Sequence, residues 1–277
     1  MTASIVCGVD HSSHAREAAG VAAFLAERLG LRLIVVHAVP ATVPPVIPAW
    51  PSRRRDDRGD VREQAAASAE RLVADVVQRI DVPDVIGCVE EGLAPERLCR
   101  AADEHSAAFI VVGTHGDRAA HAAVVGSVSL AVTRMATCPV VVVPPNVTAA
   151  PLESSQTKSI VCGVAHEEDE RPVRVAARLA RQLDLALLPV HVVPSHDDGR
   201  SGATVAGIRT LLTDGGPAIR VGEPAQQLAQ VADEARAAML VVGTRGRGAV
   251  RSALFGSVSR DPARRSTTPV VLCSDRI

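Results

Sequence analysis

The sequence predicts an α/β protein built from two tandem, doubly wound parallel sheets, and two observations predict it. First, the chain repeats itself: residues 4–9 read Ser-Ile-Val-Cys-Gly-Val, and residues 159–164 repeat all six. Second, short apolar runs rich in valine and isoleucine alternate with segments of helical period, which is typical of buried parallel strands joined by helices. Further matching segments follow in the same order, which indicates a duplicated domain: 36–40 with 190–194, 111–114 with 241–244, 126–129 with 256–259, and 139–141 with 269–271.

The apolar runs and the helical periods place the elements of the first half in order. The first helix is predicted because Ala18, Ala22, Leu25 and Leu29 step by four, three and four residues. It is expected to begin at an N-cap, Ser12 or Ser13, and to end before Gly30. Two more helical patterns follow, from about Val61 to Arg79 and around Leu98, Ala101 and Ala102, and a last helix opens at Gly126–Ser129. The predicted strands are Ile5–Val9, Leu33–Val39, Val85–Val89, Phe109–Val112 and Val140–Val143.

Composition shifts divide the chain into a first domain at 1–146, a linker at 147–158 and a second domain at 159–277. The linker is rich in Pro, Ser and Thr, which are typical of a connecting segment. The spacing between matching residues falls from 154 at His37 and His191 to 130 at Gly126 and Gly256, so the second domain is shorter by about 24 residues. The missing stretch corresponds to most of the second helix region, and only a short helix near Ala203–Leu212 is predicted there.

The composition excludes several classes of protein. Charge is balanced, with 30 basic and 31 acidic side chains, and aromatic residues make up 1%. A nucleic-acid surface is therefore not expected, because it would need a basic face or stacking aromatics. The single lysine, Lys158, does not follow a glycine, which rules out a G-x-x-x-x-G-K-[ST] phosphate loop. No apolar run is long enough to cross a membrane and no signal-peptide pattern opens the chain, so we expect a cytoplasmic protein without membrane insertion. The six cysteines form no C-x-x-C pair and are expected to act as small buried hydrophobes.

A glycine motif follows equivalent predicted strands in both halves. In the first half it is Gly113, Gly116, Gly126 and Ser127, a G-x₂-G-x₉-G-S spacing, and Gly243, Gly246, Gly256 and Ser257 repeat it without a slip. Glycines let the backbone approach a phosphate closely, and N–H groups at a helix N-terminus favour an anion. The motif therefore indicates a polyphosphate cradle that needs no lysine. The alternative is that these glycines only make tight turns and that each serine is only an N-cap.

These features resemble a tandem universal stress protein of the family's ATP-binding branch, over nearly all of both halves. The residues that carry the resemblance are Asp10 after the first strand, Val36-His37 in the second, and G-x₂-G-x₉-G-S in each copy. The resemblance implies two Rossmann-like domains, each with a five-stranded parallel sheet, and it implies ATP, with Mg²⁺, as cofactor. In the first half the implied binding residues are Val9, Asp10, Ala38, Val112, Gly113, Gly116, Gly126, Ser127 and Val128. In the second half they are Val192, Val242, Gly243, Gly246, Gly256, Ser257 and Val258.

The second half departs from this pattern, because Ala165 stands where the first half has Asp10. Alanine cannot orient a ribose hydroxyl or a magnesium ion, so we expect ATP to bind mainly in the first half. Two features point the other way. Arg245 and Arg247 add positive charge that could neutralise phosphate in the second cradle, whereas Asp117 adds a negative charge near the first. His37 and His191 each lie in an apolar strand and are expected to be hydrogen-bonded core histidines rather than ligands.

The resulting prediction is an ATP-binding regulatory protein of the stress response, not an enzyme. Two alternatives stay open: an interaction or scaffold module that needs no nucleotide, with Ala165 as its main support, and a slow ATPase. No G-x-S-x-G elbow or H-E-x-x-H helix is present, so no catalytic residues are predicted. The apolar last strands, Val140–Val143 and Val270–Cys273, are expected to pair edge to edge and to join the two halves about a pseudo-twofold axis. The same edges also suggest a homodimer, with an unidentified regulatory protein as a further partner.

Overall fold

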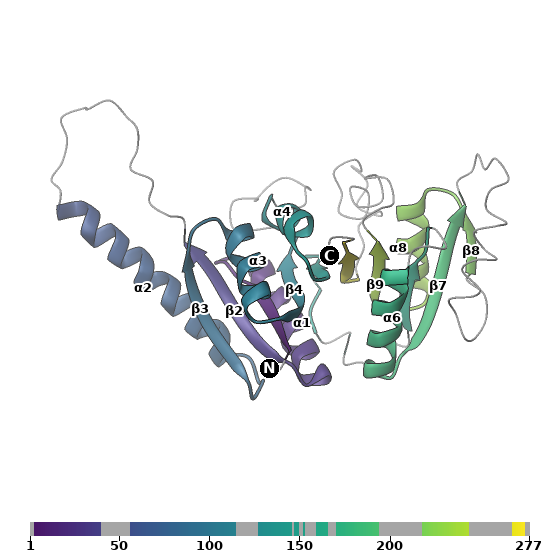
Figure 1. The fold of residues 1–277 in the computed structure, drawn as a ribbon, viewed down its shortest axis with the longest axis horizontal. Coiled ribbons are helices and arrows are strands. Elements are labelled where there is room, and N and C mark those ends of the chain that lie inside the picture. Colours follow the sequence, from purple (N-terminus) through teal and green to yellow (C-terminus); the bar gives the residue numbers. More distant parts are fainter. Residues whose placement is uncertain are drawn as a thin grey trace, which may run out of the picture.

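The computed structural model describes residues 3–39, 56–114, 127–145, 147–149, 152, 159–165, 170–193, 218–243 and 268–274. Within these ranges the chain alternates strands and helices, and ten strands form one continuous sheet (Figure 1). The first-half elements are β1 Ser4–Gly8, α1 Ser13–Leu29, β2 Arg32–Val39, α2 Asp56–Gln78, β3 Val85–Glu91, α3 Ala94–Glu104, β4 Ala107–Gly113, α4 Ser127–Met135 and β5 Val140–Val143. Those of the second half are β6 Ser159–Gly163, α6 Glu170–Leu183, β7 Ala186–Val193, β8 Ala218–Val221, α8 Pro224–Glu234, β9 Ala237–Gly243 and β10 Val270–Cys273.

The strand order is β3-β2-β1-β4-β5-β10-β9-β6-β7-β8, so each half contributes five parallel strands in the same internal order. The expected fold class, two tandem doubly wound five-stranded sheets, is confirmed. The predicted short helix near Ala203–Leu212 lies outside the described residues. Among those that are described, no helix has both the length and the apolar composition needed to span a membrane.

The two halves join through their last strands, which run antiparallel with Val141 opposite Val271. This confirms the expected edge-to-edge pairing inside the chain. The homodimer expected through these same edges is not shown: within the chain β5 and β10 use them to pair with each other. The free edges of the sheet belong instead to β3 and β8.

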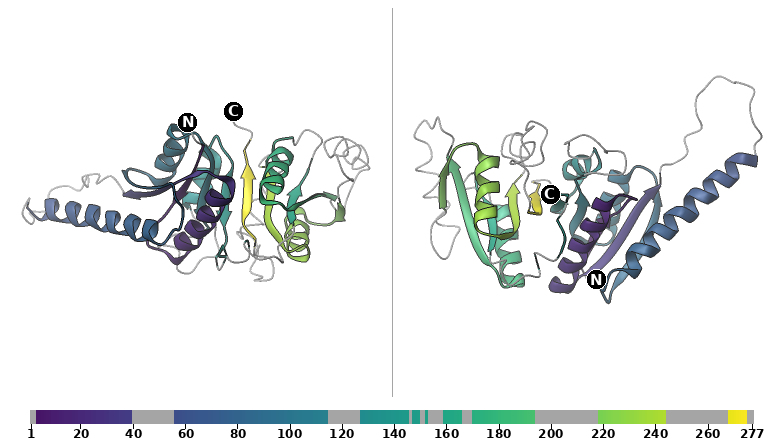
Figure 2. Two further views of the ribbon diagram at one scale, coloured as in Figure 1. Left: turned by 90° about the horizontal axis from the view of Figure 1, so that it is seen from below. Right: turned by 180° about the vertical axis from the view of Figure 1, so that it is seen from behind.

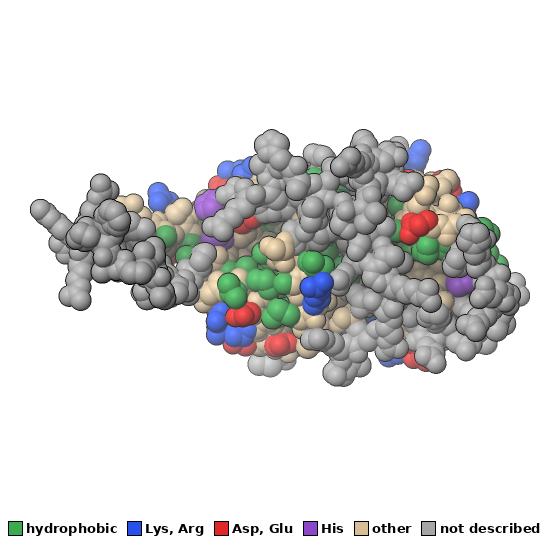
Figure 3. Space-filling view, turned by 90° about the horizontal axis from the view of Figure 1, so that it is seen from above, with side chains coloured by type: hydrophobic (Ala, Val, Ile, Leu, Met, Phe, Trp, Pro, Cys, Tyr) green, Lys and Arg blue, Asp and Glu red, His purple; other side chains and the backbone are tan. Residues whose placement is uncertain are grey.

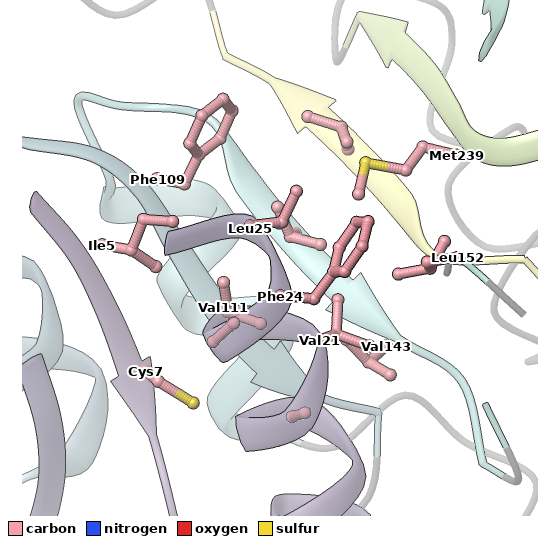
Figure 4. Close-up of a cluster of buried hydrophobic side chains, with 14 of the residues drawn as sticks. Ile5, Cys7, Val21, Phe24, Leu25, Phe109, Val111, Val143, Leu152 and Met239 are labelled. Atoms are coloured by element: carbon pink, nitrogen blue, oxygen red, sulfur yellow. The ribbon is translucent and has the colours of Figure 1, made fainter. Parts of the chain in front are cut away.

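Helices cover both faces of the sheet, and each hydrophobic cluster continues from one half into the other. On one face α1, α2 and α6 pack on the sheet, and on the other face α3, α4 and α8 do so. Figure 4 shows the junction on the first face, where Phe24 of α1 lies beside Leu152 and Met239 of β9. Figure 2 shows that the first turns of α2 extend beyond the sheet. The halves therefore share one core rather than two separate ones.

Local signals in the sequence explain how α1 begins and ends. Ser12 is the N-cap, and its hydroxyl accepts a hydrogen bond from the backbone N–H of Ala15 at 3.1 Å. Gly30 ends the helix with φ of 62°, in the left-handed region that glycine adopts at little cost. Both ends agree with the prediction, and α1 therefore leaves β1 at a defined position.

Candidate functional site

The winding of the first half reverses between β1 and β4. From β1 the chain moves through α1 to β2 and β3 on one side, whereas β4 and β5 lie on the other side. The helix that follows β1 packs on one face of the sheet and the helix that follows β4 packs on the opposite face. The two connections therefore diverge at the carboxyl ends of β1 and β4, which is where doubly wound sheets bind ligands. The second half has the same reversal between β6 and β9.

Asp10 lies at this reversal point, directly after the first strand, and its carboxylate is held by the start of α1. Its Oδ1 accepts hydrogen bonds from the Ser12 backbone N–H at 3.0 Å and from the Ser12 hydroxyl at 2.5 Å. The same hydroxyl caps α1, so a chain of hydrogen bonds links Asp10 to the helix N-terminus. Asp10 was predicted from its place after the first strand, whereas Ser12 was expected only as a possible helix cap and not as the partner of Asp10. The Asp-x-Ser spacing, which favours such side-chain turns, was the available signal.

A histidine from the neighbouring strand fixes the residue before Asp10. Val9 donates its backbone N–H to the Val36 carbonyl at 2.9 Å, and Nδ1 of His37 lies 2.8 Å from the Val9 carbonyl oxygen. Because a carbonyl oxygen only accepts, Nδ1 carries the proton, and in the neutral ring Nε2 is then an acceptor. The ring of His11 packs edge-on against the His37 ring, with 5.8 Å between the ring centroids. Figure 3 shows histidine side chains gathered on one side of the first half.

On the other side of the reversal point, Gly113 ends β4 where the chain has no room for a side chain. A Cβ at this position would lie 3.2 Å from the backbone oxygen of His14 in the first turn of α1. Glycine therefore allows β4 and α1 to approach closely. The next residue, Thr114, is buried, and its N–H donates to the Val143 carbonyl at 3.0 Å.

The structure separates the predicted site residues into three groups. Val9, Asp10, Ala38, Val112 and Gly113 lie at the carboxyl ends of the adjacent strands β2, β1 and β4, and Ser127 and Val128 open α4 with exposed side chains. The side chains of Val9 and Val112 are buried in the two core clusters, so these two residues can meet a ligand only through their backbone. In the second half Val192, Val242 and Gly243 lie at the ends of β7 and β9. The remaining six lie outside the described residues: Gly116, Gly126, Gly246, Gly256, Ser257 and Val258.

The second half repeats the framework but not the carboxylate. Val164 donates its N–H to the Val190 carbonyl at 2.9 Å, and His191 Nδ1 lies 2.8 Å from the Val164 oxygen, as in the first half. Ala165 follows and is exposed. The prediction that both strand histidines are hydrogen-bonded is confirmed, although only His191 is fully buried and His37 is partly exposed.

Burial makes the thiols near the sheet poor nucleophiles. Burial raises the pKa of Cys7 to about 12, and it raises the pKa of Cys99 to about 11, with a smaller contribution from Asp103. Burial likewise raises the pKa of Cys138 to about 12. A thiol this weakly acidic forms almost no thiolate near neutral pH. The expectation of buried cysteines holds for Cys7, Cys99, Cys162 and Cys273, whereas Cys88 and Cys138 are only partly buried.

The fold defines a class: a duplicated, doubly wound α/β protein whose winding reverses between two strands in each half. Comparison with known proteins identifies the family, because the universal stress protein family model matches residues 1–144 and 213–274. The chain belongs to the universal stress protein family.

Some relatives match along the whole chain and others match one half of it. Universal stress protein Rv2623 of Mycobacterium tuberculosis is 27% identical over 312 residues, which covers 99% of this chain and 97% of that protein. A universal stress protein of Thermus aquaticus is 33% identical over 146 residues, covering 52% of this chain and 99% of that protein. A crystal structure of a universal stress protein from Archaeoglobus fulgidus shares the fold, with a TM-score of 0.66 at 20% identity and 98% of each chain covered.

Proposed function

We propose that the first half binds ATP, together with Mg²⁺, at the reversal point between β1 and β4. The observation that carries the proposal is the arrangement of three groups along this edge of the sheet. The Asp10 carboxylate is oriented by Ser12, the end of β4 at Gly113 has no side chain, and α4 begins at Ser127 on the far side. Such a set offers a carboxylate, the backbone at the end of a strand and a helix N-terminus to one elongated ligand.

The charges of these groups suggest how the nucleotide lies. The N-terminus of α4 carries partial positive charge and favours the phosphates, with Ser127 and Val128 beside them. Asp10 would repel a bare phosphate, so it suits the ribose hydroxyls or a magnesium ion. Mg²⁺ commonly takes one or two carboxylates and otherwise binds phosphate oxygens and water, which fits a single carboxylate here. The base then points toward β2, where the backbone of Ala38 is available.

The proposed contacts comprise the predicted set from both halves, with the first half as the stronger site. Val9, Ala38, Val112 and Gly113 would contribute backbone groups, and Asp10 its carboxylate. The remaining members would complete the two cradles: Gly116, Gly126, Ser127 and Val128 in the first half, and Val192, Val242, Gly243, Gly246, Gly256, Ser257 and Val258 in the second. Ala165 supplies no carboxylate, so the second half is proposed to bind weakly or not at all.

The nucleotide is proposed to act as a regulatory ligand of a stress-response protein rather than as a substrate. A ligand that binds one arrangement of the surrounding segments more tightly shifts the population toward it and changes the surface offered to a protein partner. One rival function has a specific observation in its favour. The hydrogen bonds from Ser12 give Asp10 a purely structural role at the start of α1, which would suit an interaction module without nucleotide.

Two measurements separate these functions. Freshly purified protein is denatured and any released nucleotide is identified by chromatography and mass spectrometry. ATP binding in the presence of Mg²⁺ is then measured by isothermal titration for the wild type and for Asp10→Asn, which keeps the side-chain shape and an oxygen for Ser12 but removes the charge. We expect one strong site that Asp10→Asn weakens at least tenfold, because hydrogen bonds and metal contacts to a charged group are the strong ones.

The matched control is Ala165→Asp, which restores the missing carboxylate in the second half and is expected to add or strengthen a second site. Two equal sites in the wild type would contradict the proposed asymmetry. No binding by the wild type would overturn the proposal and favour the interaction module. Release of ADP that depends on Asp10 would instead favour the slow ATPase.

A further inference from the structure

Arg97 carries a buried donor that the structure leaves without a partner. In the part of the chain that the structure describes, its Nε is the one buried side-chain nitrogen or oxygen with no hydrogen bond. Buried polar groups in folded proteins nearly always have a partner, so each exception calls for a reason. Arg97 lies in the first turn of α3, directly after the end of β3.

The backbone near the end of β3 makes room for this side chain. Gly92 follows β3 with φ of 141°, and it donates its N–H to the Val39 carbonyl at the end of β2 at 2.8 Å. A Cβ on Gly92 would lie 2.5 Å from Nε of Arg97 and 3.1 Å from both Cζ and Nη2. The Arg97 guanidinium therefore occupies the space that a side chain at position 92 would need, and the positive φ also favours glycine there.

The acidic side chains beside it do not account for this placement. Glu90 is engaged by a different arginine, Arg100, at 3.1 Å. Glu91, the next residue along the strand, is also engaged elsewhere. Arg97, unlike Arg100, therefore forms no ion pair among the described residues. The N–H groups of its guanidinium lie close to the carboxyl end of β2.

The second half repeats the geometry with a different side chain. Gly222 has φ of 140° and donates to the Val193 carbonyl at 2.9 Å, matching Gly92 and Val39. The residue packed against it is Gln227, whose Cγ and Nε2 lie 3.3 Å from a Cβ built on Gly222. In each half, therefore, a glycine packs against a long polar side chain five residues later, and we call this glycine position the seat. The side chain on the seat is an arginine in the first half and a glutamine in the second.

This seat lies next to the base end of the proposed nucleotide. Ala38 pairs with Glu90 and Val39 with Glu91, so Gly92 comes one step beyond Ala38 and Val39 at the same edge of the sheet. With phosphates at Ser127 and the ribose at Asp10, a base beside Ala38 faces the β3 side. We propose that Arg97 is a specificity residue that donates hydrogen bonds to acceptor atoms on the purine base, an inference that rests on the proposed nucleotide site.

The chemistry of the two side chains predicts their preferences. A guanidinium offers only donors, which suits the paired acceptors O6 and N7 of guanine, and it can also donate to a single ring nitrogen of adenine. A glutamine offers one donor and one acceptor, which matches N6 and N7 of adenine. Arg97 thus makes the first half tolerant of both purines, whereas glutamine at the same seat favours adenine.

The test compares ATP, GTP and adenosine by isothermal titration in three proteins: wild type, Arg97→Met and Arg97→Gln. Arg97→Met keeps the apolar stem, and it is expected to weaken both ATP and adenosine by about tenfold or more, the loss expected for hydrogen bonds from a charged donor. Arg97→Gln is expected to raise the ratio of ATP to GTP affinity by about fivefold or more. The matched control is Arg100→Met, which removes the same charge from the same helix and should leave all three affinities unchanged.

Each other outcome overturns the inference. A loss for ATP but not for adenosine would place the contact at the phosphates. An unchanged ratio of ATP to GTP in Arg97→Gln, or wild-type affinity in Arg97→Met, would leave no contact with the base. If the wild type binds no nucleotide, the proposed function is wrong. If the wild type binds nucleotide and the Arg97 variants bind it equally well, only the role of Arg97 is wrong.

Discussion

Arg171 crosses the junction between the two halves, and replacing it tests how the junction is held. Arg171, in the first turn of α6, donates from Nη1 to the Ser274 carbonyl after β10 at 2.6 Å. Its Nη2 donates to the carbonyl of Thr137 before β5 at 2.7 Å. One guanidinium thus binds the backbone next to both strands of the antiparallel pair. The perturbation is Arg171→Met, which keeps the apolar stem and removes both donors.

The structure sets the size of the effect. Hydrogen bonds from charged donors contribute about 1.5–3 kcal/mol each, and the contact to Thr137 is exposed to water, so we expect a combined loss of about 2 kcal/mol in the free energy of unfolding. In a protein of this size that loss lowers Tm by about 4–8 °C. The core clusters continue across the junction, so unfolding is expected to stay a single transition.

The assay is urea and thermal unfolding followed by circular dichroism. The control is Arg174→Met on the same helix, because among the described residues Arg174 forms an ion pair with the exposed Glu170, at 2.9 Å. An exposed pair of this kind contributes about 0.3–0.5 kcal/mol. Equal losses for Arg171→Met and Arg174→Met would refute the reasoning, because they would show that the bonds to Thr137 and Ser274 add nothing beyond a surface ion pair.

Two further predictions concern the strand histidines and the buried thiol of Cys7. His37→Leu leaves the Val9 carbonyl without its donor, and His191→Leu does the same at Val164, so each variant should destabilise the fold by about 1–2 kcal/mol. Only His37→Leu should weaken nucleotide binding, and His37→Asn, whose amide nitrogen replaces Nδ1, should restore it. Isothermal titration measures the binding and thermal unfolding measures the stability of each variant. The folded-state pKa of Cys7 is about 12, above the ordinary 9.0, so its contribution to stability is complete below pH 9 and is lost as pH rises toward 12. The unfolding free energy of the wild type should therefore fall by about 1 kcal/mol more than that of Cys7→Ala between pH 8 and pH 10, and identical pH dependence in urea titrations would contradict this assignment.

Most of the fold could be predicted from the sequence because its signals are local or repeated. Strands buried on both faces appear as unbroken apolar runs, such as Val140–Val143, and the observed β5 has the same bounds. The cap at Ser12 and the glycine at Gly30 mark α1 correctly, because both act within one turn of the helix. Because the domain is duplicated, the pattern that predicts an element in one half could be checked against the matching segment of the other half.

The site was only partly predictable, because its geometry depends on residues distant in sequence. Asp10 and Gly113 could be identified because each lies at the end of a predicted strand. The sequence did not predict which side chains near them point into the core. Val112 belongs to the buried cluster, since alternate residues of a strand face opposite sides of the sheet. The seat of Arg97 on Gly92 and the contact of Arg171 with Thr137 have no counterpart in any local motif.

By itself, the sequence determined the two-copy α/β architecture, the ends of its first helix and the loss of a carboxylate at Ala165, since periodicity, caps and residue identity are properties of short stretches of chain. Only the tertiary structure decided that β5 and β10 use each other's edges, that one core runs through both halves, and that Arg97 and Gln227 occupy equivalent seats. The first two outcomes depend on burial and hydrogen bonding between segments more than a hundred residues apart. The third depends on how α3 and α8 pack on the sheet, because this packing brings each side chain onto the glycine five residues before it.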